Sequence, residues 1–187
     1  MSAATLDTSR CSLHCASCPS GRVIAFEPSP TNAAQFRQNM DVNGDLSAVV
    51  TLNELAVADT PGVARFTRGK NSYVGHLADT ASGETFDVQV TTLDRFASAS
   101  NLWPDFVKVD AEGAEPRIFA GMQDVLRRKR PTLLTELHDE AGYGAFCALL
   151  REHRYVSRRI ESHESLSDHP VWQPEAEYLA LPSERHI

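Results

Sequence analysis

The sequence predicts an α/β fold in which a mostly parallel sheet carries helices on both faces and ends in an antiparallel pair of strands. Extended and helical segments alternate along the chain, with no internal repeat and no long linker, which is typical of strands joined by helical crossovers. Three of the extended segments end in acidic or imidazole side chains, and ligands of open α/β sheets bind at such strand ends.

The composition fits one folded domain. Of the 187 residues, 42% are hydrophobic and 23% are charged, which is ordinary for a globular protein. We expect a single domain over residues 21–187, preceded by an atypical cysteine-containing segment, residues 1–20.

The first predicted strand lies in residues 21–30, Gly-Arg-Val-Ile-Ala-Phe-Glu-Pro-Ser-Pro. Its apolar stretch ends on Glu27, and the two prolines that follow cannot continue a strand. Residues 31–42 then place apolar side chains at helical spacing, and the Asn-Gly pair at 43–44 ends the helix. The apolar face of this helix contains Ala33, Phe36 and Met40, with Ala34 as a further candidate.

Several short extended segments follow. Residues 48–58 are extended, and a turn at 59–62 leads into residues 63–66, which together predict a hairpin. Residues 86–93 alternate between polar and apolar side chains, as in a half-buried strand. The polar, glycine-containing stretch at 69–83 predicts a mobile loop.

The second half of the chain begins with a short apolar strand at residues 106–109. It delivers three acidic side chains, Asp110, Glu112 and Glu115. Gly113 permits a tight turn into a helix that runs to about residue 128, and Pro131 excludes its continuation.

The next strand, residues 132–137, contains Glu136 and is followed by His138. The remaining predicted elements are a helix at 141–153 and strands at 155–160 and 177–181. A polar loop, 161–174, separates the two strands, so we expect them to form an antiparallel pair at the sheet edge.

Three strand ends should converge on one crevice, because the carboxyl ends of parallel strands meet at the same edge of a sheet. Their side chains are Glu27, then Asp110 and Glu112, then Glu136 and His138. A carboxylate after a strand is also an ordinary helix cap or a favourable charge in a first helical turn. For each carboxylate alone, both a role in capping a helix and a role in binding a ligand stay open. Three consecutive strand ends that carry such side chains favour a binding site.

The charge argues against nucleic acid or a membrane as the partner. The formal net charge is −7, and the basic run at residues 127–130 suits a solvated helix end. No apolar run approaches the roughly 20 residues that span a bilayer, and residues 1–20 do not have the pattern of a signal peptide. We therefore expect a cytoplasmic protein.

Six short blocks of the sequence carry a family resemblance. They are residues 21–30, 39–44, 56–59, 91–94, 107–115 and 136–138. The most specific is Val-Lys-Val-Asp-Ala-Glu-Gly-Ala-Glu at 107–115, and the blocks span well over half of the chain. In their order and spacing they resemble the FkbM-type methyltransferase family. The resemblance implies a class I methyltransferase fold, which is Rossmann-like, with S-adenosylmethionine as the cofactor and a small molecule that accepts the methyl group on a hydroxyl, typically a sugar or natural product.

The resemblance also implies roles for individual residues. Glu27, followed by Pro28, would bind the ribose hydroxyls of the cofactor. Leu55 and Ala56 would border the adenine. Asp110 would lie beside the methionine end of the cofactor and the incoming hydroxyl.

A base is useful in this reaction, because an alcohol holds its proton tightly. The catalytic candidates are Asp110, Glu112, Glu136 and His138. The imidazole of His138, with an ordinary pKa of roughly 6.5, is better matched to neutral pH than a carboxylate. A histidine just past a strand is also often a hydrogen-bonded polar group without a catalytic role.

The start of the chain departs from the family pattern. In the family, the strand before residue 21 lies in the middle of the sheet and leads into a glycine-rich turn that holds the methionine moiety. Residues 1–20 contain no glycine. We therefore expect the first strand to be missing or degenerate, which would leave two neighbouring strands without their shared partner.

The cysteines of this segment have a suggestive spacing. Cys11, Cys15 and Cys18 match the C-x3-C-x2-C pattern by which radical enzymes that use the same cofactor hold an iron–sulfur cluster. The downstream segments do not predict the barrel that such an enzyme needs, and a zinc site through His14 lacks a second pair of ligands. We expect the cysteines to be incidental, no metal to be bound, and Cys147 to be a core residue.

The sequence thus predicts an S-adenosylmethionine-dependent O-methyltransferase domain with an incomplete cofactor site. The alternative is an inactive remnant or binding subunit that keeps Glu27 and Asp110 without holding the cofactor, and a metal-binding module built on the cysteines is a weaker third possibility. A nicotinamide-dependent dehydrogenase also places an acid after such a strand, but it has no use for the block at 110–115. The methyl acceptor and the oligomeric state stay open.

Overall fold

The computed structural model describes residues 21–44, 48–68, 75–77, 85–162 and 164–185. The cysteine-containing segment, residues 1–20, lies outside this described part, as does most of the predicted loop at 69–83. In the described part, no helix has the length and apolar character needed to cross a membrane.

Strands and helices alternate along the chain. The strands are β1 (Val23–Phe26), β2 (Val50–Asn53), β3 (Ala56–Val57), β4 (Gly62–Arg68), β5 (Gly75–Leu77), β6 (Thr85–Thr91), β7 (Phe106–Val109), β8 (Thr132–Leu137), β9 (Tyr155–Arg159) and β10 (Ala176–Pro182). The helices are α1 (Pro30–Val42), α3 (Leu93–Ser100), α4 (Glu115–Ala120), α5 (Gln123–Arg128) and α6 (Glu140–His153), followed by the 3-10 turn η2 (Ser183–Arg185). The prediction of a mixed α/β fold is confirmed.

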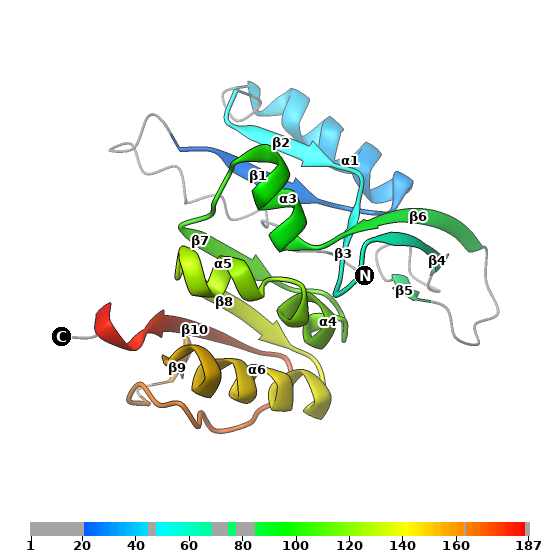
Figure 1. The fold of residues 1–187 in the computed structure, drawn as a ribbon. Helices are drawn as coiled ribbons and strands as arrows, with labels where there is room; N and C mark the ends of the chain where they lie inside the picture. Colours follow the sequence, from blue (N-terminus) through cyan, green and yellow to red (C-terminus); the bar gives the residue numbers. More distant parts are fainter. Residues whose placement is uncertain (1–20, 45–47, 69–74, 78–84, 163, 186–187) are drawn as a thin grey trace.

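The described strands form three sheets (Figure 1). β1 pairs with β2, the order β7-β8-β10-β9 makes a second sheet, and the order β3-β6-β4-β5 makes a third. The pairs β1–β2, β7–β8 and β3–β6 are parallel. The other four pairs are antiparallel, so the described strands do not form the mostly parallel sheet that was predicted. The reason is that β4, β5, β9 and β10 all join their sheets through antiparallel neighbours.

Helices cover both faces of the β1–β2 sheet, as predicted. Successive side chains of a strand point to opposite faces. Ala25 packs with Phe36 and Met40 of α1. The next residue, Phe26, packs edge to face against Phe96 of α3, with ring centroids 4.8 Å apart. The two helices therefore lie on opposite faces of this sheet.

The second sheet carries the predicted antiparallel pair at its edge. β10 lies between β8 and β9, and it pairs antiparallel with both. In β8 the side chains of Leu133, Thr135 and Leu137 are buried and the residues between them are half-buried. This buried face shares one hydrophobic core with Ile118 of α4 and Phe146 of α6. Burying a side chain of this size contributes about 1.5–3 kcal/mol.

β1 and β7 each have a single partner among the described strands. β1 pairs with β2 alone and β7 with β8 alone, in separate sheets. Both strands end in residues of the predicted site. The strand expected to be missing or degenerate would fall in residues 1–20, which lie outside the described part, so this expectation stays a prediction.

The predicted hairpin around residues 59–62 is wrong. β4 follows that turn, but its partners are β6 and β5, and β3 lies on the other side of β6. The extended stretch 48–58 also divides, because β2 belongs to the sheet of β1 and β3 to that of β6. A turn signal shows where a chain reverses and carries no information about which strand becomes its partner. β5 lies within the stretch predicted as a loop.

Helix α3 replaces the end of a predicted strand. The strand predicted at 86–93 ends at Thr91, and Thr92 caps α3 through a hydrogen bond from the backbone N–H of Arg95 to its hydroxyl at 3.0 Å. α3 has only eight residues, too few for a helical period to stand out in the sequence.

The long helix predicted up to residue 128 is divided into α4 and α5. The carboxylate of Asp94, in α3, accepts hydrogen bonds from the backbone N–H groups of Asp124 and Val125 at 2.9 and 2.8 Å. A carboxylate from another helix thus caps the start of α5. Gly121 lies at the break, where a Cβ atom would come within 2.0 Å of the carbonyl oxygen of Ala58.

Replacing Gly121 by alanine is therefore expected to lower the free energy of unfolding by about 3 kcal/mol, because two backbone segments must separate. Gly144→Ala is the matched control, since nothing lies within 4 Å of a Cβ atom there. In the interior of α6 it should raise stability by up to about 1 kcal/mol. Urea unfolding measures both, and equal stability of the two variants would show that the contact between Gly121 and Ala58 is absent.

Candidate active site

The acidic turn after β7 closes around a buried carboxylate. Glu115, the first residue of α4, is 0% exposed. Its Oε1 accepts hydrogen bonds from the backbone N–H groups of Ala111 and Gly113 at 3.1 and 3.2 Å. Gly113 has φ 92°, which confirms the predicted glycine turn, and Glu112 has φ 50°, a left-handed value that is uncommon for a glutamate.

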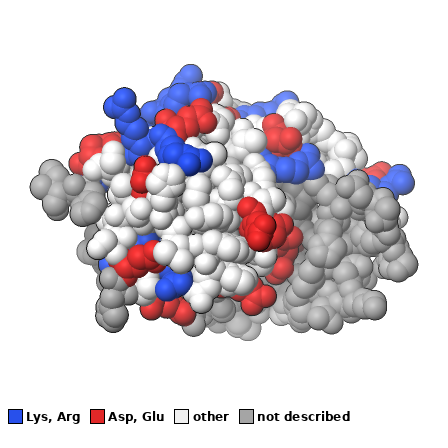
Figure 2. Space-filling model, turned by 90° about the horizontal axis from the view of Figure 1, so that it is seen from below, with Lys and Arg blue, Asp and Glu red and all other residues white. Residues whose placement is uncertain are grey.

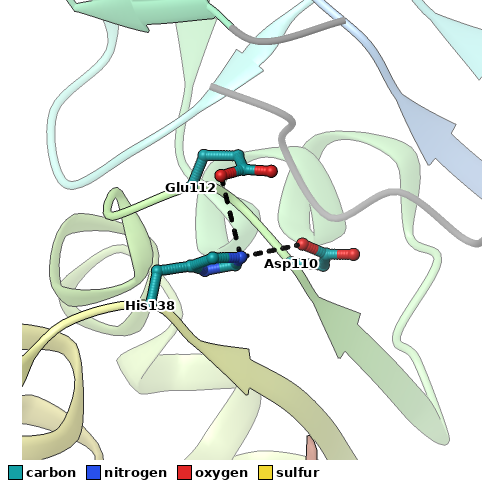
Figure 3. Close-up of side chains that lie close together, drawn as sticks. All are labelled: Asp110, Glu112 and His138. Atoms are coloured by element: carbon teal, nitrogen blue, oxygen red, sulfur yellow. Dashed lines mark ion pairs between the residues drawn. The ribbon is translucent and has the colours of Figure 1, made fainter. Parts of the chain in front are cut away.

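His138, directly after β8, connects this turn to the neighbouring strand. Its Nδ1 lies 2.9 Å from Oε1 of Glu115. On the other side of the ring, Nε2 lies 3.7 Å from Oδ1 of Asp110, 3.8 Å from Oε2 of Glu112 and 3.7 Å from Oε1 of Glu136. Figure 3 shows the ring directed between Asp110 and Glu112. The structure therefore brings the four predicted catalytic residues together.

The charges of this cluster determine which groups carry protons. The hydrogen bond to Glu115 outweighs burial and raises the pKa of His138 to about 9, and the charges of Glu112 and Asp110 act in the same direction. His138 is therefore an imidazolium at neutral pH, which donates hydrogen bonds and accepts none. Burial by itself would raise the pKa of Glu115, but its hydrogen bonds lower it on balance. Burial, and next the charge of Asp110, raise the pKa of Glu136.

Lys108 supplies a second cation. Its Nζ lies 3.5 Å from Oδ2 of Asp110 and 3.9 Å from Oε1 of Glu177 in β10, and its side chain is 11% exposed. Glu177 is paired across the strands with Glu136. The lysine therefore reduces the repulsion among carboxylates that come from β7, β8 and β10.

Asp110, Glu112 and His138 offer ligand atoms within 4.8 Å of one another, a spacing that a cation could bridge. A metal ion binds imidazole through a free lone pair. His138 carries protons on both ring nitrogens at neutral pH, as its raised pKa implies. A cation bound to this trio would therefore have to displace one of these protons.

Glu27 lies at the end of β1 and is 6% exposed. Its Oε1 accepts a hydrogen bond from the backbone N–H of Ser29 at 2.8 Å, and its Oε2 accepts one from Nδ2 of Asn32 at 3.4 Å. Burial raises the pKa of Glu27, whereas these two hydrogen bonds lower it. Ser29 also caps α1 by accepting a hydrogen bond from the backbone N–H of Asn32. Pro28, which lies between Glu27 and Ser29 in the sequence, is buried.

Asn32 is a candidate that the sequence interpretation does not include. Its Oδ1 is buried and has no hydrogen-bond partner among the described residues. Because Nδ2 of the same amide donates to Glu27, the free acceptor lies close to that carboxylate. The sequence feature that could have identified Asn32 is its position in the first turn of the helix that follows a strand ending in an acidic residue.

Leu55 and Ala56 lie just after the strand that neighbours Glu27. The backbone N–H of Glu27 donates to the carbonyl of Asn53, at the end of β2, at 3.0 Å. Leu55 is half-buried and packs against the main core, and Ala56 is fully buried in β3. Their role beside an adenine remains a prediction.

Among the described residues, no hydrogen bond or ion pair joins Glu27 to the cluster around His138.

The surface drawn in Figure 2 has a mixed charge. Lys and Arg side chains lie close to Asp and Glu side chains around a largely uncharged area. The basic residues of the run at 127–130 follow this pattern, since Arg127 pairs with Asp124, Lys129 with Asp105 and Arg130 with Glu184. Arg127 and Lys129 agree with the interpretation of the run as a solvated helix end, whereas Arg128 lies over the ring of Trp103 and Arg130 donates to the carbonyl of His153 at 2.9 Å.

Comparison with known proteins places these features in a family. A family model described as the methyltransferase FkbM domain matches residues 7–162. Among solved structures, the crystal structure of Methyltransferase FkbM from Methylobacillus flagellatus KT is similar, with a TM-score of 0.56 and 13% sequence identity. The match covers 85% of this chain and 36% of that one, so this chain spans about a third of that structure. No curated protein gives a significant match.

Proposed function

The chain belongs to the FkbM methyltransferase family, and we propose that it uses S-adenosylmethionine to methylate a hydroxyl group on a sugar or natural-product small molecule. We also propose that its sheets form a class I, Rossmann-like methyltransferase fold. The observation that carries the proposal is the group of hydrogen-bond acceptors at the end of β1, Glu27 and Asn32. The site around His138 would then receive the methyl acceptor.

The residues at the end of β1 fit the ribose of this cofactor. Each oxygen of Glu27 receives one hydrogen bond from the protein, so each keeps acceptor capacity. Oδ1 of Asn32 lacks a donor among the described residues, and a buried acceptor without a partner is costly. A vicinal diol brings two O–H donors. Glu27 and Asn32 would therefore hold the ribose.

When bound, S-adenosylmethionine supplies an electrophilic methyl group. The protein has to orient the acceptor hydroxyl, exclude water and take up the hydroxyl proton. As an imidazolium, His138 cannot take that proton. We propose Glu136 as the base, because burial raises the pKa of its carboxyl and so makes it a stronger proton acceptor than an ordinary glutamate. Asp110 and Glu112, which also lie near Nε2, would hold the acceptor.

Calorimetric titration with S-adenosylmethionine tests the proposal. We expect saturable binding, and we expect S-adenosylhomocysteine to form when hydroxylated acceptors are added. Asp41→Asn, at an exposed position near the end of α1, is the control and should bind the cofactor as the wild type does. Absence of heat at millimolar cofactor would contradict the proposal and favour the alternative of an inactive remnant or binding subunit.

A further inference from the structure

Glu115 is a fully buried carboxylate whose charge the proposed reaction does not use. It is 0% exposed, and Oε1 alone receives the two backbone hydrogen bonds and the contact to Nδ1 of His138. Its Oε2 has no partner among the described residues. Burying a carboxylate is costly unless it is paired, so the charge at this position requires an explanation.

Closing the turn after β7 does not explain the charge. The backbone N–H groups of Ala111 and Gly113 need an acceptor oxygen, and the neutral amide of a glutamine would provide one. The contact to Nδ1 differs, because a negatively charged oxygen stabilises the imidazolium through a charge-assisted hydrogen bond and a neutral amide oxygen in the same place would do so only weakly. The negative charge is therefore required only by His138.

We propose that Glu115 is a positioning residue that acts through His138: it holds Nδ1–H and so directs Nε2–H toward Asp110, Glu112 and Glu136. The inference rests on the proposed function, since it concerns how the acceptor site is kept in place. The charged groups that face the ring are Glu115 of α4, Asp110 and Glu112 after β7, and Glu136 of β8.

The arrangement explains how three carboxylates can share one place. Each lies 3.7–3.8 Å from Nε2, too far for a hydrogen bond but close enough for an ion pair. The imidazolium reduces their mutual repulsion, and Glu115 keeps the ring charged and in one orientation. A hydroxyl group held among these carboxylates would have a donor at Nε2 and an acceptor at Glu136.

Nuclear magnetic resonance of the histidine rings tests the proposal on the Glu115→Gln variant without any ligand. The His138 signals are assigned by their loss in His138→Gln. In the wild type we expect a pKa near 9 and, above it, a neutral ring protonated at Nδ1. In Glu115→Gln we expect the pKa to fall toward the ordinary 6.5, because the amide oxygen that replaces Oε1 still accepts from Nδ1–H but carries no charge.

Glu140→Gln is the matched control, an exposed carboxylate two residues after His138, and it should leave the ring unchanged. A folded Glu115→Gln variant with the wild-type pKa would overturn the proposal. If that variant does not fold, an ordinary pKa or an Nε2–H tautomer in the wild type would overturn it equally. Failure of S-adenosylmethionine to bind would refute the proposed function and leave this result standing.

Discussion

Replacing Glu27 by alanine is expected to weaken S-adenosylmethionine binding about 100- to 1000-fold. The substitution removes the carboxylate that would accept both ribose hydroxyls, and two hydrogen bonds to a charged group are together worth about 3–4 kcal/mol. The loss of affinity should be large because Glu27 is only 6% exposed, so water cannot easily take the place of the missing carboxylate. Calorimetric titration of the variant and the wild type at equal ionic strength measures the ratio of the dissociation constants.

Two controls separate binding from folding in this experiment. Glu27 also accepts the backbone N–H of Ser29, so its loss weakens the start of α1, and urea unfolding measures that cost. Glu27→Gln keeps an acceptor for this N–H and removes the charge, so it should bind the cofactor with intermediate affinity. Unchanged affinity of a folded Glu27→Ala variant would show that the ribose is not bound at the end of β1.

Much of the fold follows from local sequence signals. The strand at 23–26, the helix after it and the buried strand β8 are predicted from apolar periodicity, proline and glycine alone. The partners of the strands are not predicted in this way, because strand pairing is decided by contacts between residues that are distant in the sequence. β4 lies beside β6 and not beside β3, although the turn at 59–62 is where the sequence indicates it. The need for glycine at position 121 could not be predicted for the same reason, because it arises from the carbonyl of Ala58, which is distant in the sequence.

The candidate site shows a similar division between position and role. Asp110, Glu112, Glu136 and His138 come together as the order of strand ends predicts. The protonation of His138 could not be predicted, because Glu115 lies 23 residues away in the sequence and its side chain contacts the ring only in the folded chain. In the sequence, Glu115 is simply an acidic residue in a first helical turn, which is favourable for any helix.

The two halves of the candidate site lie on different sheets among the described strands. The cluster around His138 joins β7 and β8, which are hydrogen-bonded neighbours. Glu27 belongs to a separate sheet, and β1 and β7 have no common partner among the described strands. The proposed cofactor binding at Glu27 and the proposed base at Glu136 can therefore be wrong independently of one another, and cofactor binding should be measured before turnover.

The free energy of unfolding should decrease by about 2–3 kcal/mol as the pH rises from 6.5 to about 9.5. The pKa of His138 is raised from 6.5 to about 9 in the folded protein, so the folded state binds the proton more tightly than the unfolded chain does. This stabilisation is fully present below pH 6.5 and is lost as the pH passes through 9. Glu115, whose pKa is lowered, remains ionised over the whole range and adds no slope.

Urea unfolding at intervals from pH 6 to pH 10 measures this dependence in the wild type and in His138→Gln. The difference between the two proteins reports the histidine and the carboxylates that contact it, because titratable groups far from the ring contribute equally to both. We expect the difference to shrink with rising pH as the wild type loses its advantage. Parallel curves would mean that His138 titrates alike in the folded and unfolded chain. In that case the ring would be neutral at pH 7, and His138 would again compete with Glu136 as the base of the proposed reaction.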